Sequence, residues 1–344
     1  MRKEADDTGP IAELEHWRQR RAKFNSLLDQ CKSQECKSVI MILVYAKSKV
    51  LKQWKELDNR ITDLANEAKD NVKYLDTIEN SCQPLYQSDP VSMMPAIPKL
   101  INAIQMIHST SHYYNTPQRM TSLFIKVTNQ MVTACKEYLT DKRKNKIWDQ
   151  ARGPLIEKIE SCVNLNKEYQ NVFQRTKQRI EADPSEKAFE FSEMYIFGKF
   201  DTFCRRLFKI RELMEFIEVH SVLHVSKIEG IDTLAARFDN IYKNLLVKPY
   251  DPLDHRKTDF DHDFQKFKND MADLDAQLQS FMDNCFDKMT NIMQSLQLLE
   301  RFGKLNLPSM KEAIDTRYDH LFQEFGQDVI KVRNNCHTRA HTTY

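Results

Sequence analysis

Apolar residues recur along most of this chain in steps of three and four, the spacing that places side chains on one face of an α-helix. The longest stripe, over residues 264–302, contains no glycine or proline and predicts a single helix about 60 Å long at about 1.5 Å per residue. A second long stripe covers residues 39–75 with little interruption. Shorter stripes lie at residues 11–28, 100–107, 120–138, 155–176, 203–217, 234–245 and 314–329. No strand-like alternation of comparable strength occurs, so the pattern predicts an all-α fold.

The prolines separate these stripes. They fall between the stripes or at their starts, as expected of a residue that breaks helix interiors but suits a first turn. They predict boundaries between bundles near residues 84–98, 141–154 and 247–258. Thr116 followed by Pro117 predicts a helix that begins at this proline. Only 6 residues are glycine, where average usage of about 7% would give roughly 24, which favours long helices with few tight turns.

Each stripe has to be buried against a neighbouring helix. Because one core rarely grows beyond about 250–300 residues, the 344-residue chain predicts an elongated row of helical bundles with long antiparallel helices. Heptad-like spacing is also compatible with a two-stranded coiled coil. The stripes are broad, rich in aromatic residues and interrupted every few turns, which favours the bundles.

Composition excludes several classes of partner. The 51 basic and 49 acidic residues leave a net charge of +2, so there is no electrostatic basis for binding nucleic acid or an acidic membrane. No apolar stretch approaches the 18 or more residues typical of a membrane span. The first residues also lack the apolar run of a signal peptide. The 8 cysteines include no CxxC pair, and we expect reduced thiols.

No motif predicts catalysis, a cofactor or a metal. The sequence contains no GxxxxGK[ST], GxGxxG or HExxH motif, and we expect a protein that is not an enzyme. His108 with His112, and His220 with His224, have the i, i+4 spacing of a metal pair on a helix. No carboxylate or cysteine completes either set, so we expect structural histidines. The basic run at 142–146 is expected to be a solvated loop.

Surplus aromatic residues provide the candidate partner-binding site. An interface is anchored by exposed aromatic side chains surrounded by polar groups. Packing within the protein's own core is the alternative for the same residues. The candidates are Trp17, Phe189, Phe191, Tyr195, Phe197 and Phe200.

A family resemblance covers residues 9–333. The chain resembles the first N-terminal tail region of dynein heavy chains, and its details are most similar to an axonemal outer-arm heavy chain of the gamma type. The number and order of the matching segments make the resemblance specific. They include GPIAELEHWRQRRAKFNSLLDQ at 9–30, RITDLANEAKDNVKYL at 60–75, IPKLINAIQMIHSTSHYYNT at 97–116, RMTSLFIKVTNQMVTAC at 119–135, FEFSEMYIFGKFDTFCRRLFKI at 189–210, YDPLD at 250–254, FDHDFQKF at 260–267 and LQLLERFGKLNLP at 296–308.

The resemblance implies a structural tail segment that assembles with other dynein heavy chains, intermediate chains and light chains. It implies an indirect association with axonemal microtubules, and a location in the cytoplasm, the cytoskeleton and the cilium axoneme. The ATPase ring of the family lies far downstream of this region. Residues 1–8 are expected to form a disordered N-terminus. Residues 334–344 match nothing expected of the family, and residues 335–344, polar and without period, are expected to be disordered.

Two other interpretations compete with this one. A motor ATPase requires phosphate loops, which the sequence lacks. An unrelated helical scaffold or tethering rod of the spectrin type would carry an internal repeat of fixed period, and none is found.

Overall fold

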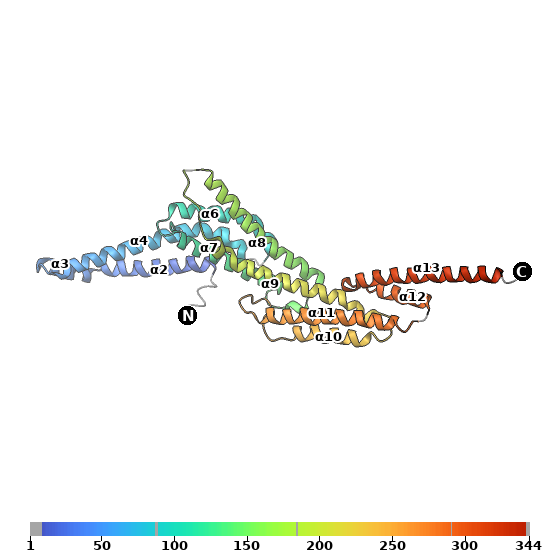
Figure 1. Ribbon diagram of the computed structural model, residues 1–344. Helices are drawn as coiled ribbons and strands as arrows, with labels where there is room; N and C mark the ends of the chain where they lie inside the picture. Colours follow the sequence, from blue (N-terminus) through green and yellow to red (C-terminus); the bar gives the residue numbers. More distant parts are fainter. Residues whose placement is uncertain (1–8, 87–88, 184, 290, 342–344) are drawn as a thin grey trace. The chain divides into compact units, whose positions relative to one another are not determined.

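The computed structural model describes residues 9–86, 89–183, 185–289 and 291–341, and these residues contain helices and turns but no strand (Figure 1). The all-α prediction is therefore confirmed. The chain forms two compact units, Met1–Leu207 and Phe208–Tyr344. The boundary falls inside one helix, α9 (Glu193–His220), which contributes residues to both units. The predicted boundaries near 84–98, 141–154 and 247–258 are connections between helices.

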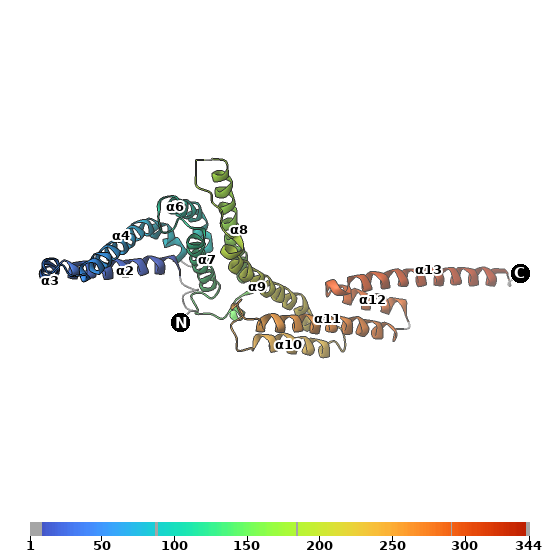
Figure 2. The same cartoon turned by 60° about the vertical axis from the view of Figure 1, so that its left-hand side comes forward.

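Unit 1 begins with a long helical hairpin. Helix α2 (Pro10–Cys31) packs along α4 (Val50–Cys82), and the short helix α3 (Gln34–Tyr45) lies at the far end of the pair (Figures 1 and 2). The predicted continuous stripe over 39–75 is thus two helices. Lys47, with a φ of 47°, turns the chain between them.

The start of α2 needs a glycine. Gly9 is extended and Pro10 occupies the first helical turn, where its missing N–H costs nothing. A Cβ at Gly9 would lie 2.7 Å from the Tyr86 hydroxyl and 2.8 Å from Oε1 of Gln130. The backbone N–H of Ile11 donates to the same Tyr86 hydroxyl at 3.2 Å. The close approach of these groups fixes the base of the hairpin.

The core of unit 1 lies among α4, α6 (Ile97–Thr110), α7 (Pro117–Leu139), α8 (Arg152–Glu181) and the first half of α9. The proline-rich connection before α6 consists of short turns: η1 (Gln83–Tyr86), α5 (Pro90–Met93) and η2 (Met94–Ala96). Helix α7 begins at Pro117 as predicted. Thr116 takes the N-cap position, but its side chain makes no capping hydrogen bond. Another short turn, η3 (Ile147–Asp149), precedes α8.

Unit 2 contains the second half of α9 and the helices that follow it. The turn η4 (Ser221–Val225) leads to α10 (Asp232–Leu246), which packs against α11 (Asp259–Phe286). Helix α12 (Ile292–Gly303) and the turn η5 (Pro308–Met310) then lead to α13 (Lys311–His341), and α12 packs against α13. Phe260, Phe264 and Phe267 of α11 are buried and supply much of this core.

The single 60 Å helix predicted over residues 264–302 is wrong. The stripe is divided between α11 and α12. The side chain of Asn291 caps α12 by accepting from the N–H of Met293 at 2.9 Å, a local bond that competes with a continuing helix. Helix α12 then returns alongside α11. The centre of the Phe302 ring lies 6.3 Å from that of Phe286 and 6.2 Å from that of Phe281. Apolar spacing alone does not distinguish one long helix from two that fold back.

The end of the chain also differs from expectation. Helix α13 continues to His341, so the backbone of residues 335–341 is helical where we predicted disorder. No glycine or proline follows Gly326, and nothing in the sequence stops the helix. Residues 342–344, and the N-terminal residues 1–8 for which disorder was also predicted, lie outside the described residues.

Candidate interaction surfaces

The predicted aromatic cluster lies in the core of unit 1. Phe189 is 1% exposed and Phe200 is 0% exposed, while Phe197 and Phe191 are also buried. The ring of Phe189 lies 4.8 Å from Phe191 and 5.2 Å from Phe173 of α8. These edge-on and tilted contacts are typical of core aromatic packing. These four residues therefore pack in the core of unit 1, which is the alternative that the sequence left open.

Trp17 is buried as well, and it anchors α2. Its Nε1 donates to the Tyr114 hydroxyl at 2.9 Å, and that hydroxyl donates to Oε1 of Glu13 at 2.7 Å. The second oxygen of Glu13 lies 3.3 Å from Nζ of Lys126 on α7. Burial, followed by the nearby Glu13 charge, raises the pKa of Tyr114, so this hydroxyl stays protonated. The network joins the base of the hairpin to the segment between α6 and α7.

Tyr195 is the exception among the six candidates. It is 64% exposed in the first turn of α9, and the neighbouring Met194 is also exposed. A side chain that its own unit covers offers little area to a partner. Tyr195 therefore remains the candidate partner-binding residue of this segment.

Helix α3 carries a surface that sequence reasoning missed. None of its residues is buried, although residues 39–45 are all apolar. The most exposed large apolar side chains of α3 and the start of α4 are Tyr45 at 94%, Met41 at 72%, Ile42 at 67%, Val39 at 55%, Val44 at 53% and Val50 at 53%. Scattered apolar side chains are normal on a surface, but a contiguous patch marks an interaction site. The available signal of this surface was the run of seven consecutive apolar residues without a polar face. The apolar spacing was interpreted instead as a helix face buried in the core.

The surroundings of α3 are strongly basic. Residues 31–55 contain six lysines and a single acidic residue, a net charge of +5 where the whole chain has +2. The six lysines are all exposed, and in the part of the chain that the structure describes they form no ion pair. They are Lys32, Lys37, Lys47, Lys49, Lys52 and Lys55. We call α3, Val50 and these lysines the hairpin tip.

Helix α13 carries a second apolar surface, in unit 2. The side chains of its middle turns recur in steps of three and four, and we call them the α13 stripe. They are Phe322 at 66% exposed, Phe325 at 56%, Val329 at 51% and Val332 at 62%. Its first turns contact α12, but in both views the later turns extend past that helix (Figures 1 and 2).

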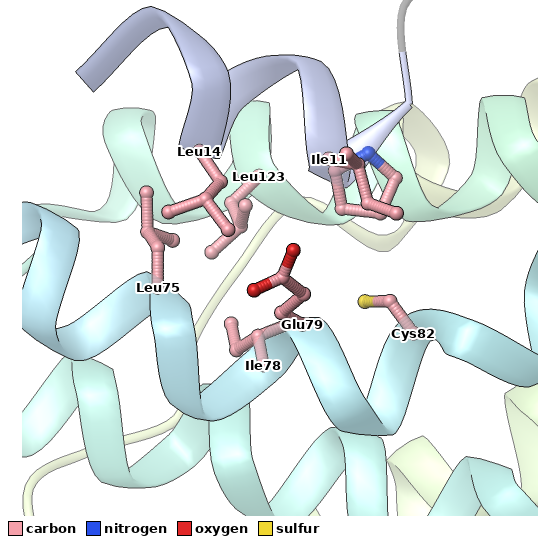
Figure 3. Close-up of a pocket in the computed structure, with 8 residues that line it drawn as sticks. Ile11, Leu14, Leu75, Ile78, Glu79, Cys82 and Leu123 are labelled. Atoms are coloured by element: carbon pink, nitrogen blue, oxygen red, sulfur yellow. The ribbon is translucent and has the colours of Figure 1, made fainter. Parts of the chain in front are cut away.

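One shallow pocket lies at the base of the hairpin. Leu14 of α2, Leu75 of α4 and Leu123 of α7 line it, and the Glu79 carboxylate points in among the lining residues (Figure 3). Its empty volume of about 220 Å³, open mouth included, is below the roughly 300–1,000 Å³ of most ligand sites. Arg18 engages the same carboxylate at 2.8 Å. The pocket is a packing defect between three helices that offers one already paired polar group.

The two histidines of each pair lie in different surroundings. His108 is buried against the Phe191 ring at 5.0 Å, and burial followed by the charge of Lys187 lowers its pKa to about 4, whereas His112 is exposed. Nε2 of His220 lies 3.1 Å from Asp275, and Nε2 of His224 lies 2.9 Å from a different carboxylate, Asp239. Among the described residues, no group of three or more histidine, cysteine or acidic side chains is placed to hold a metal ion.

The remaining sequence candidates concern the basic run and membranes. Residues 142–146 are exposed, and Asp141, Lys142 and Arg143 have φ between 47° and 65°, a turn that leads toward α8. Within the described ranges, no helix combines the length and the apolar character needed to cross a bilayer.

Comparison with known proteins gives one family. The family model described as "Dynein heavy chain, N-terminal region 1" matches residues 1–343. The chain is 53% identical over 323 residues to mouse "Dynein axonemal heavy chain 8" and 51% identical over 329 residues to rat "Dynein axonemal heavy chain 5". It is 37% identical over 333 residues to the "Dynein gamma chain, flagellar outer arm" of Chlamydomonas reinhardtii. These matches cover 94%, 96% and 96% of the chain but only 7%, 9% and 7% of the respective relatives.

Proposed function

The chain belongs to the dynein heavy chains, whose N-terminal region 1 it matches over residues 1–343, and we propose that it is a structural tail segment on which an axonemal dynein assembles. The matched relatives are axonemal or flagellar heavy chains, and the chain spans less than a tenth of their length. The proposed location is the cytoplasm, the cytoskeleton and the cilium axoneme.

The observation that carries this proposal is the placement of the exposed apolar side chains. Many of them lie at the hairpin tip and on the α13 stripe, while the same two units bury other apolar faces thoroughly. A buried apolar core with a polar edge is the usual anatomy of a protein interface. The proposed partners are other dynein heavy chains, intermediate chains and light chains. Through them the segment would associate indirectly with axonemal microtubules, with no nucleic acid and no membrane as partner.

We further propose that this chain does not catalyse a reaction. Phosphoryl transfer by motor ATPases needs backbone amides around the phosphates, a lysine and a magnesium ligand. The sequence contains no phosphate-loop motif. The pocket between α2, α4 and α7 is apolar, and its one carboxylate is paired with Arg18.

Affinity capture tests the scaffold function. The tagged 344-residue chain is incubated with an extract of ciliated cells, and dynein intermediate chains are measured by immunoblot. The unchanged chain is expected to retain them, and Phe322→Glu with Phe325→Glu to retain at least about tenfold less if the α13 stripe is an interface. Val247→Glu is the matched control, because Val247 is 82% exposed in unit 2 outside both surfaces. Failure of the unchanged chain to retain any dynein subunit contradicts the scaffold function.

Microtubule co-sedimentation tests the absence of motor activity. The purified chain is spun with microtubules in the presence and absence of ATP. No ATP-dependent difference is expected, since the sequence has no loop that could cradle a triphosphate. Binding that ATP releases would refute this part of the proposal.

A further inference from the structure

We propose that the hairpin tip is a docking site for an acidic amphipathic helix of a partner protein. The inference rests on the proposed scaffold function and deepens it, since it names the chemistry of one partner. Three features of the tip support it: a well-formed helix, an apolar surface that its own unit leaves open, and a surplus of lysines that form no ion pair with any described residue.

Helix α3 is closed at both ends. The Ser33 hydroxyl accepts from the N–H of Cys36 at 3.3 Å and so caps the first turn. At the other end the N–H of Ala46 donates to the Ile42 carbonyl at 2.9 Å, and that of Ser48 donates to Leu43 at 3.0 Å. The tip therefore presents its side chains from an ordered helix, which lowers the entropic cost of binding.

The apolar side chains of α3 surround the helix. Ile40 and Leu43 are partly buried, whereas Met41, Ile42 and Tyr45 point into solvent. A helix that is apolar on all sides normally lies inside a protein. A second helix laid across it would cover the exposed side chains by ordinary ridge-and-groove packing.

The lysines determine the charge of that partner. Lys37, Lys47 and Lys49 flank the apolar residues, are exposed and form no ion pair within the described residues. An amphipathic helix with acidic residues beside its apolar face would place opposite charges against them. Such complementarity speeds encounter and excludes partners of the wrong charge.

The same charge argues against two other occupants. A second copy of this chain would bring its own tip, with a net charge of +5 over residues 31–55, against the first, and like charges repel. An anionic membrane suits the lysines, but helices that lie in a membrane interface have a strongly polar face. Residues 39–45 of α3 contain no charged side chain, and the Tyr45 hydroxyl is their one polar side-chain group.

The proposal is tested on the full chain with a photo-crosslinking amino acid in place of Tyr45. The labelled chain is irradiated in ciliary extract, and the attached peptide is identified by mass spectrometry. An acidic peptide with helical apolar spacing is expected, and its yield should fall in the charge-reversed variant Lys47→Glu with Lys49→Glu. Attachment to a second copy of the chain, attachment to lipid alone, or a yield unaffected by charge reversal overturns the proposal.

A direct binding measurement accompanies it. The probe is a fluorescent synthetic helix with leucine at the apolar positions and glutamate elsewhere, and a peptide with lysine in place of glutamate is its control. Binding of the acidic peptide alone is expected, weakened by Met41→Gln with Tyr45→Ser by about 100-fold, because two large side chains no longer become buried. Val247→Gln, outside the tip, is expected to bind as the unchanged chain does. Equal binding of both peptides, or no loss in the tip variant, overturns the proposal.

Circular dichroism of each variant checks that the helices are intact. The side chains exchanged at the tip are all exposed, so folding should not depend on them. If the unchanged chain captures dynein intermediate chains while the tip variants leave all binding unaltered, only this inference fails. If the unchanged chain captures no dynein subunit, the scaffold function itself fails.

Discussion

Two apolar segments of unit 1 lie in opposite environments. The segment 189–200 has its phenylalanines almost completely removed from solvent, whereas α3 leaves most of its apolar side chains exposed. Phe124 of α7 and Phe173 of α8 meet the first segment within 6 Å between ring centres. No described residue from 18 to 64 is buried, so the outer part of the hairpin has no such neighbours. Exposure is decided by which helices lie within reach, and aromatic content does not predict it.

The hairpin itself changes character along its length. Leu14 and Trp17 of α2, with Ala68 and Val72 of α4, are buried at its base. The first buried residue of α4 is Ala65, which places the start of that helix about 20 Å farther out at about 1.5 Å per residue. Unit 1 thus has a packed base and an outer arm held mainly by the contact between α2 and α4. We expect the arm to open more easily than the base, because local stability follows buried contact.

The largest expected effect is the difference in stability between a substitution in the segment 189–200 and one in α3. Phe189→Ala empties a fully packed site and should lower the free energy of unfolding of unit 1 by about 3–5 kcal/mol. Tyr45→Ala removes a larger side chain that is 94% exposed, and should change it by less than about 0.5 kcal/mol. Urea unfolding followed by circular dichroism measures both. Comparable losses for the two variants would mean that the arm and the base are not energetically distinct.

The next effect is a pH dependence that belongs to the base. His108 is 3% exposed against Phe191, and its pKa of about 4 lies below the ordinary 6.5 because burial disfavours the charged ring. The unfolded chain therefore binds the proton more readily between these values, and stability falls as the pH drops below 6.5 toward 4. Between pH 7 and pH 5 the group should cost unit 1 about 2 kcal/mol.

His108→Leu checks that assignment. The substitution removes the titrating group and keeps the site apolar, so the loss of stability between pH 7 and pH 5 should shrink by about 2 kcal/mol. His112→Leu is the control, since His112 is exposed four residues away and should leave the pH profile unchanged. An unaltered profile in the His108 variant would assign the titration to another group.

The contrast between base and arm also shows what the sequence could predict. Apolar spacing predicts the helices, and Pro117 predicts the start of α7, because periodicity and proline chemistry are local properties. The break at Asn291 was missed, because the apolar stripe continues across it in both helices. The family and its tail region followed from the resemblance, and the match over residues 1–343 confirms them.

The candidate site was harder to predict because burial is a tertiary property. Phe189 and Tyr195 lie six residues apart in one aromatic-rich segment, yet one is 1% and the other 64% exposed. Residues 39–45 are more uniformly apolar than most core segments, and α3 nonetheless buries none of its residues. The local indications of a surface were this apolar run without a polar face and the excess of lysine around it.

A smaller effect tests how the base is joined to the hairpin. Tyr114→Phe removes the hydroxyl that links Trp17 to Glu13 and should cost about 1 kcal/mol in unfolding free energy. Tyr113→Phe is the matched control. It keeps the ring that contacts Trp17 at 4.7 Å and deletes a hydroxyl for which the described residues show no hydrogen bond. Urea unfolding of both variants measures the difference. Equal stability would mean that this network does not stabilise the contact between α2 and the segment that precedes α7.

The smallest global effect is expected from the cap of α3. Ser33→Ala removes the acceptor for the Cys36 N–H, a change that costs about 1 kcal/mol in a typical helix. Because α3 buries no residue, its first turn can open without exposing a core, and the unfolding free energy of unit 1 should change by less than about 0.3 kcal/mol. Asn291→Ala removes the equivalent cap of α12, which buries Leu299 and Phe302, and should cost unit 2 about 1 kcal/mol.

Hydrogen exchange gives the local counterpart of that result. Loss of the Ser33 cap should speed amide exchange in α3 about fivefold, the factor that corresponds to about 1 kcal/mol, with no change in α7. A partner bound at the hairpin tip should slow the same amides, because opening α3 would then also break the interface. A global loss of stability in Ser33→Ala as large as that in Asn291→Ala would instead show that the arm unfolds together with the base, and the distinction between the two regions would be lost.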